Sequence, residues 1–103
     1  MTAPIRGEVW LVDLGSAKVR PCLVISIPAH DEDRALATLV PHTTSGRASR
    51  FEVEIKLIFL RAGVFDTQNL ITIPHAKLIR KLGVLAAEQL SLVDDRVRFW
   101  LGL

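Results

Sequence analysis

The residues best suited to chemistry lie in two short segments, one that begins with Arg20 and one centred on Thr43. Arg20 comes directly before an apolar run, and arginine presents a planar fork of donors that suits a phosphate group. The second segment joins an imidazole to three hydroxyl groups, on His42, Thr43, Thr44 and Ser45. A guanidinium and several hydroxyls together could bind a phosphodiester. Each segment also has an ordinary interpretation, because Arg20 could pair with Asp13 and because Ser, Thr and Gly are common turn residues.

Whether the two segments meet depends on the strands that carry them. Residues 21–27 form a nearly continuous apolar, β-branched run, which predicts a strand buried on both faces. Residues 35–40 predict the next strand, ended by Pro41. If the two are neighbours in an antiparallel meander, the start of the first lies beside the end of the second. Arg20 and Thr43 would then share one edge of the sheet and form a phosphodiester-shaped site.

Three further candidates surround this edge. Arg47 and Arg50 flank a Gly/Ser turn and would add positive charge there. His42 is an alternative general base, because histidine titrates near neutrality. If His42 still belongs to the strand, however, it and Thr43 point to opposite faces and the imidazole is structural.

The rest of the chain predicts more strands. Residues 8–14 are β-branched and aromatic before a Gly-Ser turn, residues 51–55 alternate apolar and charged side chains, and residues 69–73 are stopped by a proline. Short strands this closely spaced leave no room for the helices of parallel βαβ units. The pattern predicts one mainly β (α+β) domain over residues 1–103, built as a small barrel or sandwich.

The C-terminal segment has a helical period. Apolar residues at 3-4-4 spacing predict an amphipathic helix from about residue 86 to residue 101, with the stripe Leu90, Val93, Val97 and Leu101. Its start has no Ser, Thr or Asp cap, and Asp94 and Arg98 are spaced to pair across one turn. A shorter helical turn is expected over residues 76–82, ended by Gly83.

Composition narrows the class of protein. Hydrophobic residues make up 50% of the chain and charged residues 23%, so the chain can bury a core. The mean hydropathy of +0.33 indicates surplus apolar surface and predicts self-association or an obligate partner. A net charge of +2 and a pI of about 9.1 are compatible with a nucleic-acid substrate.

Absent motifs exclude several kinds of site and location. No apolar run reaches the ~20 residues needed to span a bilayer, and the N-terminus does not resemble a signal peptide. The single cysteine, Cys22, cannot form an internal disulfide, so we expect a buried thiol and a cytoplasmic protein. His30, His42 and His75 are too scattered for zinc, and there is no glycine-rich phosphate loop or nucleophile elbow. We therefore expect no metal and no cofactor.

An ordered set of segments resembles the MazF/PemK toxin family, small ribonucleases of type II toxin–antitoxin pairs. The segments are residues 6–13, 20–26, 41–45, 51–53, 66–69 and 82–85. The resemblance implies an SH3-like antiparallel β-barrel of the CcdB/Kid/MazF type, with a C-terminal helix and a homodimeric assembly. It also implies a cognate antitoxin whose extended, acidic tail covers the site, and DNA binding by the toxin–antitoxin complex.

The activity implied by the resemblance is metal-independent cleavage of single-stranded RNA. The 2′-hydroxyl attacks the adjacent phosphate, which leaves a 2′,3′-cyclic phosphate and a 5′-hydroxyl. By position, the catalytic arginine and threonine of the family fall on Arg20 and Thr43. Arginine suits charge stabilisation at the phosphorane but is a poor base, because it stays protonated in proteins.

The chain departs from the family in two places. The loop of residues 15–19 is shorter than in many members, so RNA contacts from that loop are not carried over. Members close to Kid have an Arg-x-Asp-Gln arrangement, whereas here Gln68 follows Phe65-Asp66-Thr67. The arginine is missing and the aspartate is displaced by one position, so Asp66 and Gln68 are additional candidates rather than matched catalytic residues.

Two other functions on the same fold stay open. One is a CcdB-like, non-enzymatic toxin that binds a topoisomerase, for which Phe99 and Trp100 could form the contact unless they pack against the barrel. The other is an SH3-like RNA-binding module without catalysis. Such modules usually expose aromatic residues for base stacking, and the absence of Tyr and the small number of Phe count against this function.

Overall fold

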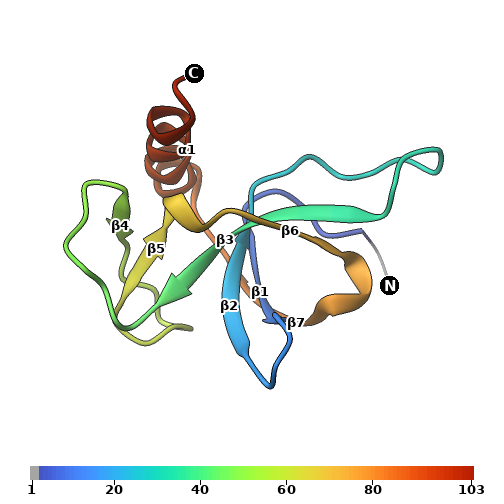
Figure 1. The fold of residues 1–103 in the computed structure, drawn as a ribbon, viewed down its shortest axis with the longest axis horizontal. Coiled ribbons are helices and arrows are strands. Elements are labelled where there is room, and N and C mark those ends of the chain that lie inside the picture. Colours follow the sequence, from blue (N-terminus) through green and yellow to red (C-terminus); the bar gives the residue numbers. More distant parts are fainter. Residues whose placement is uncertain (1–2) are drawn as a thin grey trace.

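The computed structural model describes residues 3–103, in which seven β-strands, two short 3-10 helices and one α-helix follow one another (Figure 1). The strands are β1 (Glu8–Asp13), β2 (Val19–Val24), β3 (Leu36–Thr43), β4 (Glu52–Glu54), β5 (Val64–Asp66), β6 (Ile71–Pro74) and β7 (Leu78–Val84). The 3-10 helices are η1 (Thr67–Asn69) and η2 (His75–Lys77), and the C-terminal α-helix is α1 (Ala87–Leu101). No helix within these residues is long and apolar enough to cross a bilayer.

All seven strands join one antiparallel sheet, and β3 lies at its centre. β2 pairs with one edge of β3, while the other edge carries β6 along its first half and β5 at its end. The sheet continues from β2 to β1 and β7, and from β5 to β4. The expected mainly β fold with a C-terminal helix is confirmed. Within residues 3–103 the outer strands β4 and β7 do not pair, so the sheet does not close into a hydrogen-bonded barrel.

Strand β3 continues through Pro41 to Thr43, beyond the end predicted from the proline. Pro41 lies between the stretch of β3 that pairs with β6 and the stretch that pairs with β5. A residue without an N–H is tolerated where the ladder of backbone hydrogen bonds is interrupted. The consequence is that both His42 and Thr43 belong to the strand.

The helical turn expected over residues 76–82 is wrong. Only η2 is helical there, and the segment from Leu78 onward is strand β7, which pairs with β1. The free edge of β1 offers backbone partners that override the weak local helix preference of this segment. β5 was not predicted, because three residues are too few to show an alternating pattern.

Hydrophobic residues form two clusters on opposite faces of the sheet. Leu23 faces one cluster and its neighbours Cys22 and Val24 face the other, as alternation along a strand requires. The first cluster also contains Val93 and Val97 of α1, so this helix covers one face. Burial raises the pKa of the Cys22 thiol to about 12, so this cysteine is the protonated core residue that was expected.

Helix α1 begins within one residue of the predicted position and lacks a side-chain cap of the Ser or Asp type. The Ala86 N–H instead donates to Gln89 Oε1 at 2.8 Å. The predicted pairing of Asp94 with Arg98 is wrong. Asp94 accepts two hydrogen bonds from Arg6, one of them at 2.9 Å from Nη1, because this partly buried guanidinium offers a bidentate geometry.

Candidate active site

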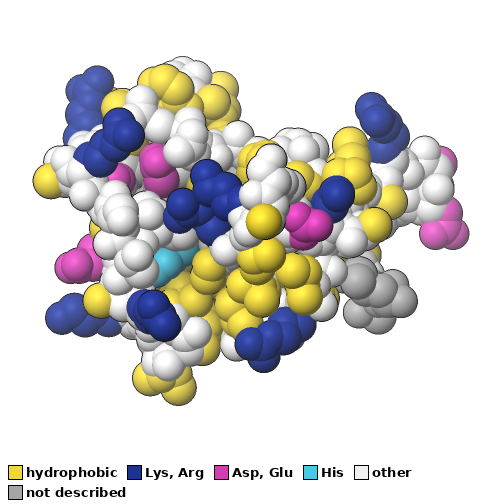
Figure 2. All heavy atoms as spheres, turned by 60° about the horizontal axis from the view of Figure 1, so that its bottom comes forward, with side chains coloured by type: hydrophobic (Ala, Val, Ile, Leu, Met, Phe, Trp, Pro, Cys, Tyr) yellow, Lys and Arg dark blue, Asp and Glu magenta, His cyan; other side chains and the backbone are white. Residues whose placement is uncertain are grey.

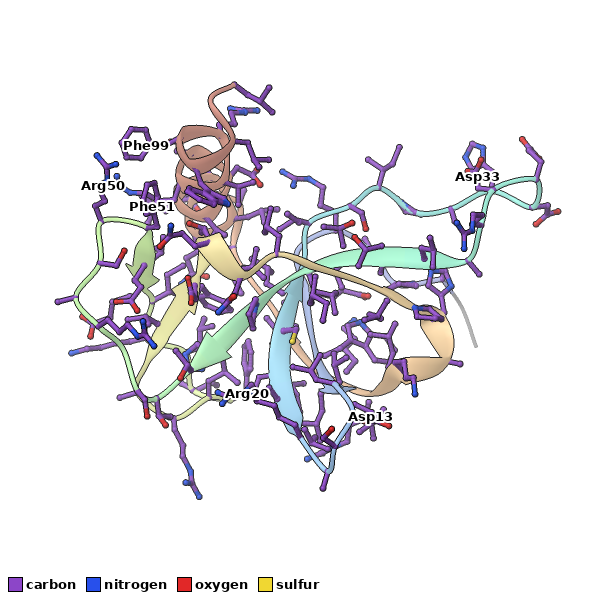
Figure 3. All side chains as sticks on the ribbon, viewed as in Figure 1. Asp13, Arg20, Asp33, Arg50, Phe51 and Phe99 are labelled. Carbon is purple, nitrogen blue, oxygen red and sulfur yellow. The ribbon has the colours of Figure 1, made fainter. Side chains whose placement is uncertain are left out.

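Arg20 and Thr43 line one cleft of about 780 Å³ where β2 begins and β3 ends. The register of the two strands pairs Cys22 with Pro41, and the same register continued by two residues places Arg20 opposite Thr43. Figure 3 shows Arg20 close to the end of β3. The adjacency predicted from an antiparallel meander is therefore confirmed.

Arg20 has no carboxylate partner within residues 3–103. The alternative pairing with Asp13 is wrong, because the Asp13 carboxylate accepts from the Gly15 N–H at 2.8 Å and lies 4.0 Å from Lys77 Nζ. A half-buried guanidinium without a protein anion is available to bind an anion from solution.

The hydroxyl-rich turn divides its side chains between two sides. Thr43 and Ser45 line the cleft, whereas Thr44 lines a separate, more open hollow. Thr43 Oγ1 accepts a hydrogen bond from the Ser45 N–H at 3.1 Å. This bond occupies an acceptor site of the hydroxyl and leaves its proton free to donate into the cleft.

The turn after Ser45 is held by Glu52 of β4. Its carboxylate accepts hydrogen bonds from the Arg47 N–H at 2.9 and 3.0 Å and from the Ser49 N–H at 3.0 Å. The hydrogen bond from Arg47 is the largest of the causes that lower the pKa of Glu52. Arg47, Ser49 and Glu52 all line the cleft, so this carboxylate fixes the loop that carries one of its cations.

Two further candidates reach the cleft, Asp66 from the end of β5 and Gln68 from η1. Asp66 and Gln68 line it beside Asn69. The Asp66 carboxylate accepts from the Gln68 N–H at 3.1 Å and from Asn69 Nδ2 at 3.0 Å. These bonds cap η1 and hold Asp66 and Gln68 next to each other, although one residue separates them in the chain.

His42 and Arg50 do not line the cleft. The His42 side chain points to the opposite face of β3 from Thr43, where it is 3% exposed and packs edge-on against Phe65 with ring centroids 4.9 Å apart. Its Nε2 has no hydrogen-bond partner within residues 3–103, and burial lowers its pKa. Arg50 lies instead over the rings of Phe51 and Phe99.

Several residues of the cleft were not singled out as site residues from the sequence. They are Leu14, Lys18, Pro41, Ser49, Glu52, Asn69, Leu70, Ile71 and Trp100. The Ser-x-x-Glu spacing of Ser49 and Glu52 is a known signal of a capping arrangement and could have identified that pair. No local signal places Trp100 here, because it comes from the far end of the chain.

The fold and the cleft together define a small antiparallel β protein in which an arginine and a hydroxyl group line one cleft beside the central strand β3. The family model of PemK-like, MazF-like toxins of type II toxin–antitoxin systems matches residues 5–101, and the chain belongs to this family. The resemblance seen in the ordered segments is thereby confirmed.

Solved structures share the fold over almost the whole chain. An endoribonuclease in complex with its cognate antitoxin, from a mycobacterial species, is 27% identical and has a TM-score of 0.85 over 98% of this chain and 97% of that chain. The Mycobacterium tuberculosis toxin MazF-mt6 is 26% identical, with a TM-score of 0.80 over 93% and 97% of the two chains. A chain of a MazE–MazF structure from Deinococcus radiodurans is 21% identical, with a TM-score of 0.85 over 100% and 99%, a likeness that shows the fold alone. No curated protein sequence matches the chain.

Proposed function

We propose that this protein is an endoribonuclease toxin that cleaves single-stranded RNA in the cleft of Arg20 and Thr43 without a metal ion. The observation that carries the proposal is that Arg20, which has no carboxylate partner among residues 3–103, lines the same cleft as Thr43. The similarity to an endoribonuclease whose structure is solved in complex with its cognate antitoxin supports it.

The cleavage would follow the route of RNA self-cleavage. The 2′-oxygen of one ribose attacks the adjacent phosphorus and loses its proton, and the bond from phosphorus to the 5′-oxygen of the next nucleotide breaks. That 5′-oxygen takes up a proton, so the products are a 2′,3′-cyclic phosphate and a 5′-hydroxyl. Negative charge that develops on the phosphoryl oxygens is stabilised by donors that are already in place, here the Arg20 guanidinium and the Thr43 hydroxyl.

The proton of the 2′-hydroxyl needs an acceptor within the cleft. Arginine is unsuited because it stays protonated, and His42 lies on the other face of β3. The two carboxylates that line the cleft, Glu52 and Asp66, both accept hydrogen bonds from neighbouring N–H groups. Glu52 accepts three such bonds and Asp66 two, so Asp66 keeps more free acceptor sites and is the candidate base. Gln68 would hydrogen-bond the substrate beside it.

The proposed function includes partners. Lys18, Arg20 and Arg47 line the cleft and would attract the acidic tail of a cognate antitoxin. Figure 2 shows hydrophobic side chains gathered on one face of the molecule, and the exposed apolar residues of the described chain include Val19 and Ile79. Such a surface supports the proposed homodimer. A cytoplasmic location and DNA binding with the antitoxin belong to the same proposal.

The decisive experiment incubates the protein with a long messenger RNA in EDTA and maps the cut ends. Cleavage should persist in EDTA, leave 5′-hydroxyl ends and be strongly reduced, by roughly 100-fold or more in Arg20→Ala, and also reduced in Thr43→Ala. Asp66→Asn should slow it and change its pH profile. Thr44→Ala is the matched control, because its side chain lies outside the cleft.

Other outcomes would identify another function. Intact RNA with undiminished binding would mean a non-catalytic RNA-binding module. Inhibition of a topoisomerase with no effect on RNA would mean a CcdB-like toxin. Equal cleavage by the Arg20→Ala and wild-type proteins would show that the reaction takes place elsewhere.

A further inference from the structure

Three aromatic side chains meet where α1 ends beside the cleft. The Phe51 ring centroid lies 5.3 Å from that of Phe99 and 5.2 Å from that of Trp100. Phe51 is 8% exposed, whereas Phe99 is 50% and Trp100 42% exposed. Figure 3 shows Phe51 and Phe99 together at this end of the molecule. Phe51 therefore supports two helix residues that remain half in solvent.

Cations surround these rings. The guanidinium carbon of Arg50 lies 4.8 Å from the Phe51 centroid and 5.0 Å from the Phe99 centroid, and that of Arg96 lies 6.0 Å from the Phe99 centroid. Arg47 lies nearby in sequence and lines the cleft. Flat aromatic faces next to backbone-binding cations are the combination with which proteins hold single-stranded nucleic acid.

Trp100 joins this aromatic group to the reaction site, because it lines the same cleft as Arg20 and Thr43. Its backbone is held in regular helix close to a capped end. Gly102 has a φ of 74°, and the Leu103 N–H donates to Arg98 O at 2.9 Å. The indole thus packs against Phe51 and is carried by a regular helix, and it lines the cleft while remaining partly exposed.

We propose that Trp100 stacks against a nucleobase of the RNA strand close to the cleaved phosphate, while Arg47 and Arg50 bind the phosphates that flank this base. The inference rests on the proposed function, since the base belongs to the strand held by Arg20 and Thr43. A purine fits better than a pyrimidine, because its two rings cover more of the indole. Three of the six aromatic residues of the chain, Phe51, Phe99 and Trp100, thus lie together at this end of the molecule.

Binding is tested with 2′-O-methyl dodecamers, which lack the attacking hydroxyl and cannot be cleaved. The probes are oligo-adenine, oligo-uracil and an abasic backbone of equal length. Trp100→Ala should weaken oligo-adenine binding about tenfold, because stacking on one aromatic side chain contributes on that scale. Oligo-uracil should lose less, Trp100→Phe should be intermediate, and abasic binding should stay unchanged since the phosphate contacts remain.

The matched control is Leu92→Ala, which removes an exposed apolar side chain of the same helix that does not line the cleft. It should bind every probe like the wild type. Equal binding of oligo-adenine by the wild-type and Trp100→Ala proteins would overturn the inference. So would a wild-type protein that binds the abasic probe as well as oligo-adenine.

Two further measurements separate this inference from the proposed function. On cleavable RNA, Trp100→Ala should raise KM and leave kcat unchanged, whereas Arg20→Ala should lower kcat strongly. If the protein did not cleave RNA but bound oligo-adenine better than the abasic probe, the nuclease function would be refuted and the stacking site would be supported. Polyglutamate is the last probe. If Trp100→Ala weakened the binding of polyglutamate but not of the oligonucleotides, the surface would be assigned to an acidic protein segment and the inference would be overturned.

Discussion

The two faces of β3 at its last two residues have opposite roles. Thr43 opens into a cleft with Arg20, Ser45 and Arg47, and its hydroxyl proton is free to donate. His42, one residue earlier, is buried against Phe65 with an unpartnered ring nitrogen. The difference shows that strand alternation decides which of two reactive side chains can meet a substrate.

The largest expected effect is a loss of RNA cleavage, which should follow from a change in the cleft and not from a change on the buried face of β3. Arg20→Ala should reduce cleavage roughly 100- to 1,000-fold, because it removes preorganised donors at the developing charge. Its unfolding midpoint should not fall, since Arg20 has no ion pair among the described residues. His42→Leu should show the reverse pattern, with nearly normal cleavage and an altered midpoint. Cleavage rates on RNA combined with urea denaturation check both, and a large loss of cleavage in His42→Leu would contradict the comparison.

Gly63 packs against the backbone of Thr43 and the ring of His42. A Cβ there would clash with the Thr43 carbonyl oxygen and lie 2.7 Å from His42 Cε1. Gly63→Ala should therefore destabilise the fold by about 1–3 kcal/mol, the usual scale for overpacking, and disturb the cleft as well. Gly46→Ala is a milder control, because its Cβ would first meet a Val64 methyl at 3.2 Å. Thermal unfolding measures the difference, and an unchanged midpoint for Gly63→Ala would show that this backbone can move apart.

The buried face should respond to pH. Burial lowers the pKa of folded His42, so as the pH falls below about 6.5, the ordinary histidine value, the unfolded chain binds the proton first. Stability from this group is then constant above pH ~6.5 and declines below it, toward the lowered pKa. Between pH 7.5 and pH 5.5, the urea midpoint should fall more in the wild type than in His42→Leu, which retains the other histidines. If the midpoints of both proteins fell equally, the pH dependence would not come from His42.

The smallest expected effect lies at the rim of the cleft. Glu52→Gln weakens the acceptor that holds the Arg47 and Ser49 N–H groups, so the loop should loosen and KM for RNA should rise several-fold with kcat nearly intact. Glu54→Gln is the matched control, because Glu54 is the exposed carboxylate of the same strand and does not line this cleft. Steady-state kinetics on one RNA test the pair, and equal KM values for both variants would show that the loop is held by other contacts.

Local patterns were sufficient for much of the fold. The apolar run after Arg20, the alternation around Val53 and the helical stripe of Val93 and Val97 correspond to β2, β4 and α1. Local sequence patterns gave wrong predictions where strand pairing determines the secondary structure. Residues 78–84 became a strand because β1 has a free edge, and Pro41 did not end β3 because it falls between two partners. Both causes lie in strand partners that are distant in the sequence, so local propensities cannot reveal them.

The sequence alone determined the two halves of the candidate site, since Arg20 and the Thr43 turn flank predicted neighbouring strands and antiparallel pairing brings such ends together. Only the tertiary structure decided which neighbours share the cleft. Thr44 and His42 point away from it, whereas Trp100 reaches it from the other end of the chain. The physical reason is that side-chain direction depends on strand parity and on helix docking. Both are settled when the sheet and α1 pack together around one core.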